Sequence, residues 1–200
     1  MKKQKLTFDS RIDYTLILPA FLLSMIGLLV LYIATNHDYP ERLGKVMTQQ
    51  ATWCVAGIIL AFIVMHFNTK VLWKLTPFFY GLGIILMLLP LKFYDPTTVA
   101  LTGAKNWVYF GGSNLFQPSE FMKISYILMM AHVVVGFQNK LKNRVLKDDF
   151  LLIIYMFLVT LPVMILLGAQ KDFGTALVFM AIFGGIVIVS GISWRIILPV

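Results

Sequence analysis

Apolar runs long enough to cross a membrane recur along this chain. A helix of about 20 residues crosses the roughly 30 Å of hydrocarbon in a bilayer. Because a backbone in lipid must satisfy its own hydrogen bonds, such runs fold as helices. The fold class predicted is an all-α polytopic membrane protein, a single transmembrane domain over residues 1–200. Six complete spans are expected near residues 14–33, 50–65, 72–91, 118–137, 150–167 and 173–190.

The composition agrees with lipid rather than water as the surrounding solvent. Hydrophobic residues make up 59% of the chain and charged residues 13%, with a formal net charge of +8. Because the Lys and Arg residues fall in short segments between apolar runs, they are expected to meet lipid headgroups, and no nucleic-acid partner is expected. The lone Cys54 and three widely spaced histidines give no disulfide framework and no metal-ligand pattern.

The basic residues also predict the orientation of the chain. Lys and Arg near span ends are retained on the cytoplasmic side. A cytoplasmic N-terminus places eleven of them inside and five outside, with Lys123 left within a span. The longer outer segments are then 34–49 and 92–117. After Arg195, "IILPV" begins a seventh apolar run that stops at Val200, which predicts that the chain is the N-terminal portion of a longer protein.

The outer segment 92–117 mixes aromatics, glycines and a lysine in the stretch "TGAKNWVYFGGSNLFQPSE". Amphipathic aromatics settle at headgroup depth, so one interpretation is an interfacial loop that anchors the neighbouring helices. The other is a lid or groove for a lipid headgroup, in which glycines at 103, 111 and 112 let the backbone approach a ligand closely. Both interpretations can hold together.

Glu120 and Lys123 are opposite charges at the start of the fourth span. Pro118 suits the first position of a helix, because its missing N–H would be unpaired there anyway. Both charges then lie at the outer edge of the span, three residues apart on one helix face, where they can pair. Ionised groups at membrane depth are functional-site candidates by default. An internal ion pair that only fixes helix packing is an equal alternative.

A second polar cluster, "GAQKDFGTA" at residues 168–176, joins the fifth and sixth spans on the same side. A tight turn in which Asp172 caps the next helix and Gly174 eases the bend explains it locally. Two acid-and-lysine motifs at one membrane surface instead indicate an outward-facing wet cavity. Pro162 would help to open it by kinking the fifth span.

These segments resemble the signatures of a known family. "GAKNWVYFGGSNLFQPSEFMKIS" is similar to the GA-(K/R)-x-W…QPSE-x-x-K signature of the SEDS family (shape, elongation, division and sporulation), and "QKDFGTA" to its Q-x-D-x-GT signature. The resemblance covers the whole chain and is greater for the elongation and cell-shape branch than for the division branch. Two positions depart from the pattern: Asn106, where many members carry a second basic residue, and Lys171, where proline is common.

The resemblance implies a peptidoglycan glycosyltransferase with about ten transmembrane helices in the bacterial cytoplasmic membrane, acting in cell-wall elongation and cell shape. It implies lipid II, undecaprenyl-pyrophosphate-linked glycan, the lipid bilayer and a class B penicillin-binding protein as partners. The catalytic base, an aspartate, would lie beyond Val200, so this chain alone would be inactive; a divalent cation such as Mg²⁺ stays open as a cofactor. The motif positions assigned to a substrate cavity are Lys105, Trp107, Gln117, Ser119, Glu120, Lys123, Gln170, Asp172 and Thr175, with Gly103, Pro118 and Gly174 as structural positions.

Two other classes of function stay open. A flippase or exporter would also place acids and lysines in an outward cavity. It should carry polar residues across the midplane, whereas the centres of these spans are apolar. A non-catalytic membrane scaffold for a transpeptidase is the other alternative, since the implied base is absent from these 200 residues.

Overall fold

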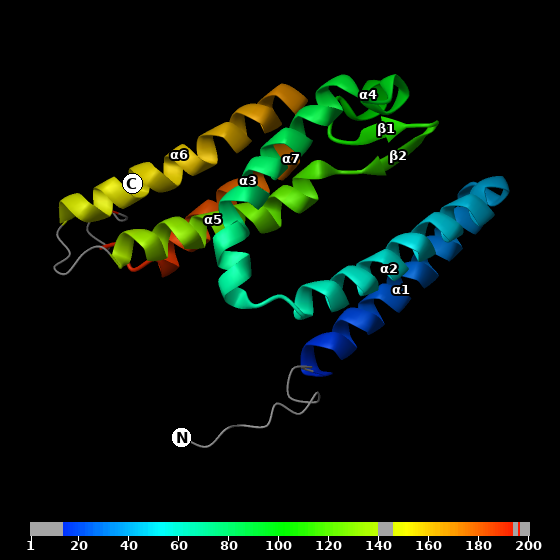
Figure 1. Cartoon of the computed structure of the whole chain (residues 1–200). Helices are drawn as coiled ribbons and strands as arrows, with labels where there is room; N and C mark the ends of the chain where they lie inside the picture. Colours follow the sequence, from blue (N-terminus) through cyan, green and yellow to red (C-terminus); the bar gives the residue numbers. More distant parts are fainter. Residues whose placement is uncertain (1–13, 140–145, 194–195, 197–200) are drawn as a thin grey trace, which may run out of the picture. The chain divides into compact units, whose positions relative to one another are not determined.

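The computed structural model describes residues 14–139, 146–193 and 196, which form helices and one small antiparallel sheet (Figure 1). The chain divides into two compact units, residues 1–67 and 68–200. The predicted start of a seventh span after Arg195 lies outside the described residues except for Ile196.

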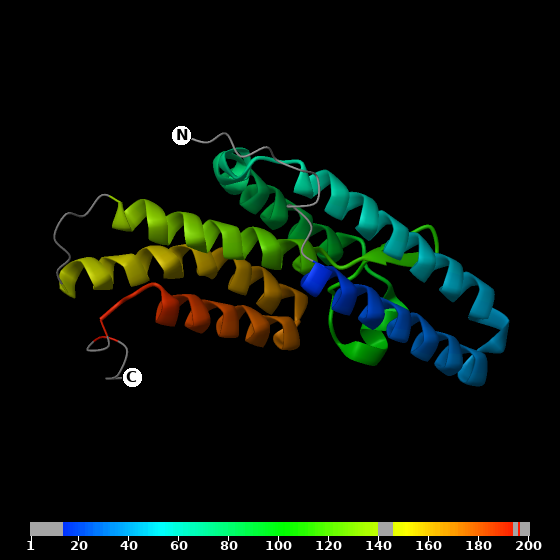
Figure 2. The same cartoon turned by 90° about the horizontal axis from the view of Figure 1, so that it is seen from below.

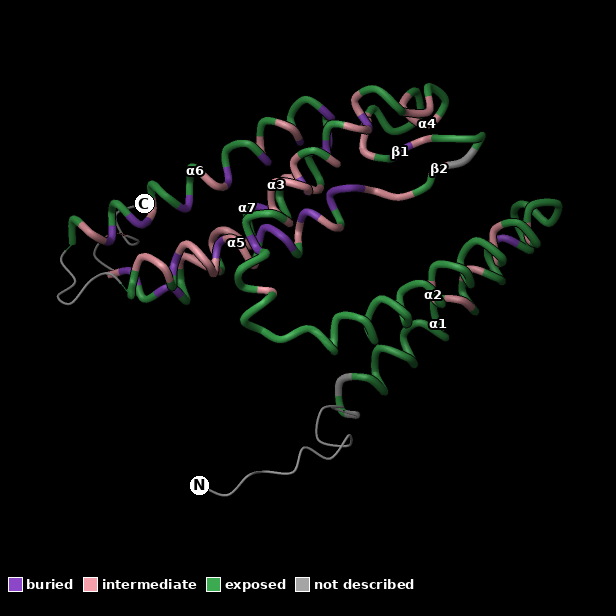
Figure 3. The backbone as a smooth tube through the Cα atoms, in the orientation of Figure 1, coloured by how far each residue is buried: buried purple, intermediate pink, exposed green. Residues whose placement is uncertain are grey.

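The first unit is a helical hairpin. Helix α1 (Tyr14–Asp38) and helix α2 (Leu43–Met65) are joined by a short 3₁₀ turn, η2 (Pro40–Arg42). The prediction of an outer loop over residues 34–49 was therefore wrong. Polar residues mark where a helix leaves lipid, but they do not end the helix. The helical hydrogen bonds of α1 continue to Asp38, and Pro40 then begins the 3₁₀ turn. Most described residues of both helices are exposed (Figure 3), many large apolar ones among them, as a lipid-facing surface requires.

The second unit is a bundle of four helices. These are α3 (Thr69–Lys92), α5 (Pro118–Gln138), α6 (Leu146–Gln170) and α7 (Phe173–Val189). Figure 2 shows α5, α6 and α7 side by side, and α3 packs on α5 and α6. The side chains that close the core are fully buried: Met87, Met122, Tyr126, Met130, Leu152, Met156, Val163, Leu167 and Phe179.

The prediction of an all-α polytopic membrane protein is confirmed. Among the described residues, five helical segments are long and apolar enough to cross a membrane, at Ile17–Asp38, Pro40–Met65, Thr69–Lys92, Pro118–Gln138 and Leu146–Gln170. The sixth predicted span, α7, is apolar but shorter, at 17 residues. The cytoplasmic position of the N-terminus stays a prediction.

The segment between α3 and α5 is ordered, which its composition did not predict. It contains the short helix α4 (Pro96–Thr102) and a hairpin of β1 (Val108–Phe110) with β2 (Ser113–Phe116). Gly111 and Gly112 have φ of 61° and 82°, and positive φ at both central residues is what a two-residue hairpin turn of type I′ requires. A Cβ at either glycine would meet nothing within 4 Å, so turn geometry rather than close packing within the protein explains them here.

The closest helix approach in the core that involves a glycine lies between α3 and α5. A Cβ added at Gly83 would collide with Sδ of Met122, and the Cα of Met122 is only 3.7 Å from that position. A Cβ at Gly81, two residues earlier on α3, would meet nothing within 4 Å. Gly83 therefore sets how closely the two helices pack.

We predict that Gly83→Leu destabilises the bundle by about 1–3 kcal/mol, because overpacking forces the helices apart. Gly81→Leu is the matched control, and it should leave stability unchanged or slightly raised, since glycine is a poor helix former. Thermal unfolding in detergent compares the two variants. Equal midpoints would show that α3 and α5 do not depend on this contact.

Candidate functional site

The connection between α6 and α7 is a tight turn built around a left-handed residue. Lys171 has φ of 58°. Its N–H donates to the carbonyl oxygen of Gly168 at 3.0 Å, and the N–H of Asp172 donates to that of Leu167 at 3.0 Å. This pair of bonds is the Schellman motif, which usually has glycine at the left-handed position. Lys171, rather than Gly174, therefore makes the bend; nothing in the structure explains the glycine at 174.

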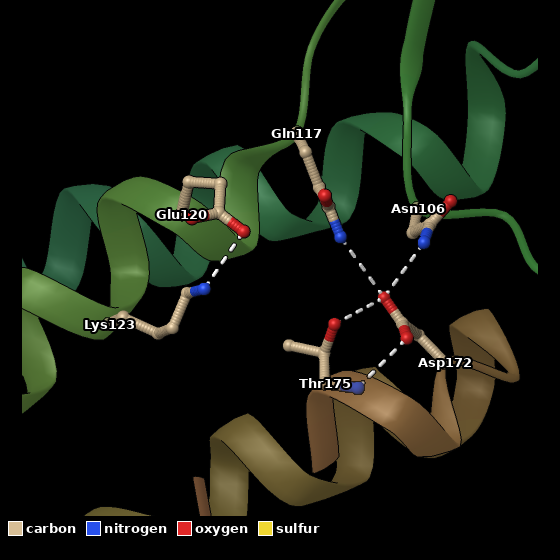
Figure 4. A network of polar contacts seen from close by, with 6 residues as sticks. All are labelled: Asn106, Gln117, Glu120, Lys123, Asp172 and Thr175. Atoms are coloured by element: carbon tan, nitrogen blue, oxygen red, sulfur yellow. Dashed lines mark hydrogen bonds and ion pairs between the residues drawn. The ribbon is translucent and has the colours of Figure 1, made fainter. Parts of the chain in front are cut away.

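The turn delivers Asp172 to the start of α7, where its carboxylate accepts four hydrogen bonds (Figure 4). Oδ1 accepts from the backbone N–H of Thr175 at 3.1 Å, which is the predicted helix cap. Oδ2 accepts from the Thr175 hydroxyl at 2.8 Å, Asn106 Nδ2 at 2.9 Å and Gln117 Nε2 at 3.2 Å. Asp172 is 7% exposed. The carboxylate therefore joins the α6–α7 turn, the loop before β1 and the start of α5.

Gln170 fastens the same turn from its other side. Its buried side chain donates from Nε2 to the carbonyl oxygen of Met87 on α3 at 2.6 Å. Its own carbonyl oxygen accepts from the backbone N–H of Lys105 at 2.8 Å. The turn is thus bonded both to α3 and to the loop before β1.

The Lys105 ammonium does not reach the Asp172 carboxylate network. Its Nζ lies 4.3 Å from the centre of the Tyr94 ring, a cation–π contact. Lys105, Tyr94 and Trp107 line a shallow recess on the loop. Asp95 and Asn106 also line it, whereas Glu120, Lys123 and Asp172 do not.

Asp95 holds the base of this loop by capping α4. Its carboxylate accepts from the hydroxyl and the N–H of both Thr97 and Thr98. These hydrogen bonds, led by those from the side chain of Thr97 and then Thr98, lower the pKa of Asp95 from 3.8 to about 2. Because the folded pKa is depressed, the cap is at full strength above about pH 4 and is lost as the pH falls towards 2.

Glu120 and Lys123 form the ion pair that their spacing predicts. Lys123 Nζ lies 2.8 Å from Glu120 Oε1, and α5 begins at Pro118 as expected. The Glu120 side chain is 62% exposed and that of Lys123 26%. Within this chain the Glu120 carboxylate is therefore the more exposed partner of the pair.

The family model for the FtsW, RodA and SpoVE proteins, described as a cell cycle protein family, matches residues 13–200. The chain belongs to this family. It is the SEDS family that the motifs resemble. The chain spans about half the length of the curated relatives it matches, between 41% and 48%.

The relatives come from both branches of the SEDS family. The peptidoglycan glycosyltransferase RodA of Treponema pallidum is 30% identical over 96% of this chain and 41% of its own length. MrdB of Escherichia coli K12 is 28% identical over 96% and 48%, and a probable FtsW of Geobacter sp. M18 is 28% identical over 85% and 45%. The greater identity to RodA agrees with the predicted elongation branch.

A solved structure of a peptidoglycan synthase complex, described as coordinating polymerization and crosslinking, has the same fold. Its matching chain has a TM-score of 0.68 and 25% sequence identity, over 93% of this chain and 50% of its own. The helical arrangement described here is thus found in a chain of this solved complex.

The structure brings part of the predicted SEDS site together. Gln117, Asp172 and Thr175 share one network, Gln170 supports it, and Glu120 and Lys123 lie one helical turn from Gln117 (Figure 4). Trp107 is 40% exposed on the loop, and the buried Ser119 hydroxyl has no hydrogen-bond partner among the described residues. Gly103, with φ of 74°, ends α4.

Asn106 is the residue of the network that sequence reasoning missed. It registered only as a departure from the SEDS pattern, whereas its side chain is bonded directly to Asp172. The one available signal was that Asn106 has a neutral amide at the position where the SEDS pattern has a second basic residue.

The site residues do not by themselves fit a resident Mg²⁺. The Asp172 carboxylate already accepts four hydrogen bonds, and Glu120 is paired with Lys123. Within the described ranges, no group of three or more His, Cys, Asp or Glu side chains could hold a metal ion. A divalent cation would need ligands from elsewhere, and no step below depends on one.

We predict opposite effects from two substitutions at Lys171. Lys171→Gly should stabilise the protein by about 1 kcal/mol, because glycine adopts positive φ without steric cost. Lys171→Pro, the residue common in the SEDS family here, should cost about 3 kcal/mol or more, since proline fixes φ near −65° and lacks the N–H bonded to Gly168.

Thermal unfolding of the two variants tests this turn. Lys171→Ala is the control for charge, because it removes the ammonium but keeps the strained backbone. Wild-type stability in Lys171→Pro would contradict the left-handed turn.

Proposed function

We propose that the protein is a peptidoglycan glycosyltransferase that polymerises lipid II in cell-wall elongation and cell-shape maintenance. The main support is the convergence of both SEDS signatures on one network centred on Asp172, beside an accessible Glu120–Lys123 pair. The curated relatives named peptidoglycan glycosyltransferases add to it.

The proposed reaction transfers a glycan from one undecaprenyl-pyrophosphate carrier to the sugar hydroxyl of another lipid-linked unit. The glycosidic bond to pyrophosphate breaks, the new glycosidic bond forms, and undecaprenyl pyrophosphate leaves. A base must take the proton of the acceptor hydroxyl, and cations must stabilise the departing pyrophosphate. The base would come from residues beyond Val200. Of the residues in this chain, Lys123 would supply positive charge, and Glu120 would hold it ionised and oriented.

The same proposal covers place and partners. The protein would lie in the bacterial cytoplasmic membrane, with its N-terminus inside and the Asp172 network at the outer surface. Its protein partner would be a class B penicillin-binding protein that crosslinks the new strands. The synthase complex that shares this fold couples polymerization to crosslinking, which supports such a pairing.

Glu120→Gln tests the proposal in the protein as the cell makes it. We expect lipid II polymerisation to fall about a hundredfold or more, since a preorganised charge is lost. Membrane abundance should hold, because exposed ion pairs contribute only about 0–1 kcal/mol to stability. The measurement is glycan formation from lipid II in proteoliposomes. The control is Glu41→Gln, the other glutamate of the chain, which is exposed in the first unit.

Three results would count against the proposal. If Glu120→Gln lowered membrane abundance as much as polymerisation, Glu120 would have a role in helix packing rather than in the reaction. Unchanged polymerisation with loss of lipid II movement between leaflets would favour a transporter. Absence of polymer from the wild type, with the transpeptidase partner still bound, would favour a scaffold.

A further inference from the structure

The Asp172 carboxylate is buried, and its four hydrogen bonds all come from the protein. An ionised carboxylate offers about two acceptor positions on each oxygen; here Oδ2 accepts three hydrogen bonds, from Asn106, Gln117 and the Thr175 hydroxyl, and Oδ1 accepts one, from the Thr175 N–H. A general base needs a lone pair directed at the proton it removes. Because Oδ2 is fully engaged and the residue is only 7% exposed, the contacts that Asp172 makes here are with other parts of the protein.

The two amide donors belong to the segments that carry the rest of the site. Gln117 follows β2 and is the residue before the first turn of α5, yet its side chain does not cap that helix. It reaches Asp172 instead. Because Glu120 and Lys123 lie within the next turn of the same helix, fixing Gln117 also fixes where this ion pair stands.

Asn106 does the same for the outer loop. It lies between Lys105, whose backbone N–H is bonded to Gln170, and the exposed Trp107. An amide donates a hydrogen bond without bringing a positive charge. A basic residue at this position would make an ion pair instead. In this chain the loop and the α6–α7 turn are therefore joined by a hydrogen bond from a neutral donor, Asn106.

We propose that Asp172 and Asn106 are positioning residues, a latch that clamps residues 103–117 and the start of α5 onto the α6–α7 turn. The latch acts on the reaction through Gln117, by holding Glu120 and Lys123 in place, and does not touch substrate. The effect of the latch on catalysis rests on the proposed function, whereas its effect on the stability of residues 103–117 does not.

Three substitutions separate the latch from the helix cap. Asp172→Ser keeps a good cap for the Thr175 N–H but is too short to reach the two amides. Asn106→Ala and Gln117→Ala each remove one donor and leave the cap intact. Asn68→Ala is the matched control, because Asn68 caps α3 through the Lys70 N–H.

Amide hydrogen exchange, measured on the whole protein in lipid nanodiscs, gives a readout independent of activity. In Asp172→Ser and Asn106→Ala, the backbone amides of residues 103–117 should exchange about tenfold faster or more, since this segment can then open without unfolding of the bundle. The centre of α6 should be unchanged, as should the loop in Asn68→Ala. Wild-type exchange of residues 103–117 in both latch variants would overturn the proposal.

Lipid II polymerisation kinetics give the second readout. Each latch variant should lower kcat about tenfold or more through misplacement of the ion pair, with KM changed far less. Asn106→Ala combined with Asp172→Ser should be no worse than Asp172→Ser alone, because both break the same bond.

The outcomes separate the two proposals. A dead Asp172→Ser with wild-type kcat in Asn106→Ala and Gln117→Ala would place Asp172 on the substrate and overturn the latch. Faster loop exchange in the variants of a protein whose wild type makes no polymer would sustain the latch and reject the proposed function.

Discussion

A carboxylate withdrawn from water must find hydrogen-bond donors within the protein, and Asp172 finds them in three segments of the chain. The position of Asp172 depends on the residue before it, because Lys171 adopts the left-handed conformation that ends α6. That turn sets Asp172 at the start of α7. Asn106 and Gln117 then bond to it from the loop and from the start of α5, so that one strained residue decides how this end of the bundle is assembled.

The charged groups at this end have different environments and different roles. Asp172 is buried and accepts four hydrogen bonds, whereas Glu120 is largely exposed and holds one hydrogen bond, to Lys123. Lys105 is engaged with the Tyr94 ring. A buried carboxylate held by several hydrogen bonds suits positioning, and an accessible ion pair suits contact with a charged ligand. The polar residues of the two SEDS signatures thus divide into those that hold the site and those that face out of it.

Much of this arrangement follows from the sequence, for reasons that depend on local chemistry. The length of the apolar runs predicted the spans, and the preference of proline for the first helical position predicted the start of α5. The spacing of three residues predicted the Glu120–Lys123 pair, and the capping preference of aspartate predicted that Asp172 caps α7. The first and fifth spans were predicted to end at residues 33 and 167, whereas α1 and α6 continue to Asp38 and Gln170, because polar composition does not stop a helix. The hairpin and α4 were missed, although two adjacent glycines marked the turn.

The remaining features depend on long-range geometry that no local pattern carries. Asn106 and Asp172 are 66 residues apart in sequence, and only the folded bundle brings them together. The positive φ of Lys171 was equally hidden, since lysine has no preference for that conformation and the neighbouring Gly174 was the more plausible bend.

The contact between Asp172 and Asn106 can be observed directly by solid-state NMR of the protein in lipid bilayers. Carbon–nitrogen dipolar transfer would be measured between the labelled Asp172 carboxyl carbon and side-chain amide nitrogens, with Asn106→Ala to assign the signal. We predict a cross-peak to Asn106 Nδ2 at a separation of about 3.5–4 Å, as a hydrogen bond of ordinary length requires. A carboxyl carbon that correlates with the Thr175 backbone nitrogen but with no side-chain amide would contradict the latch.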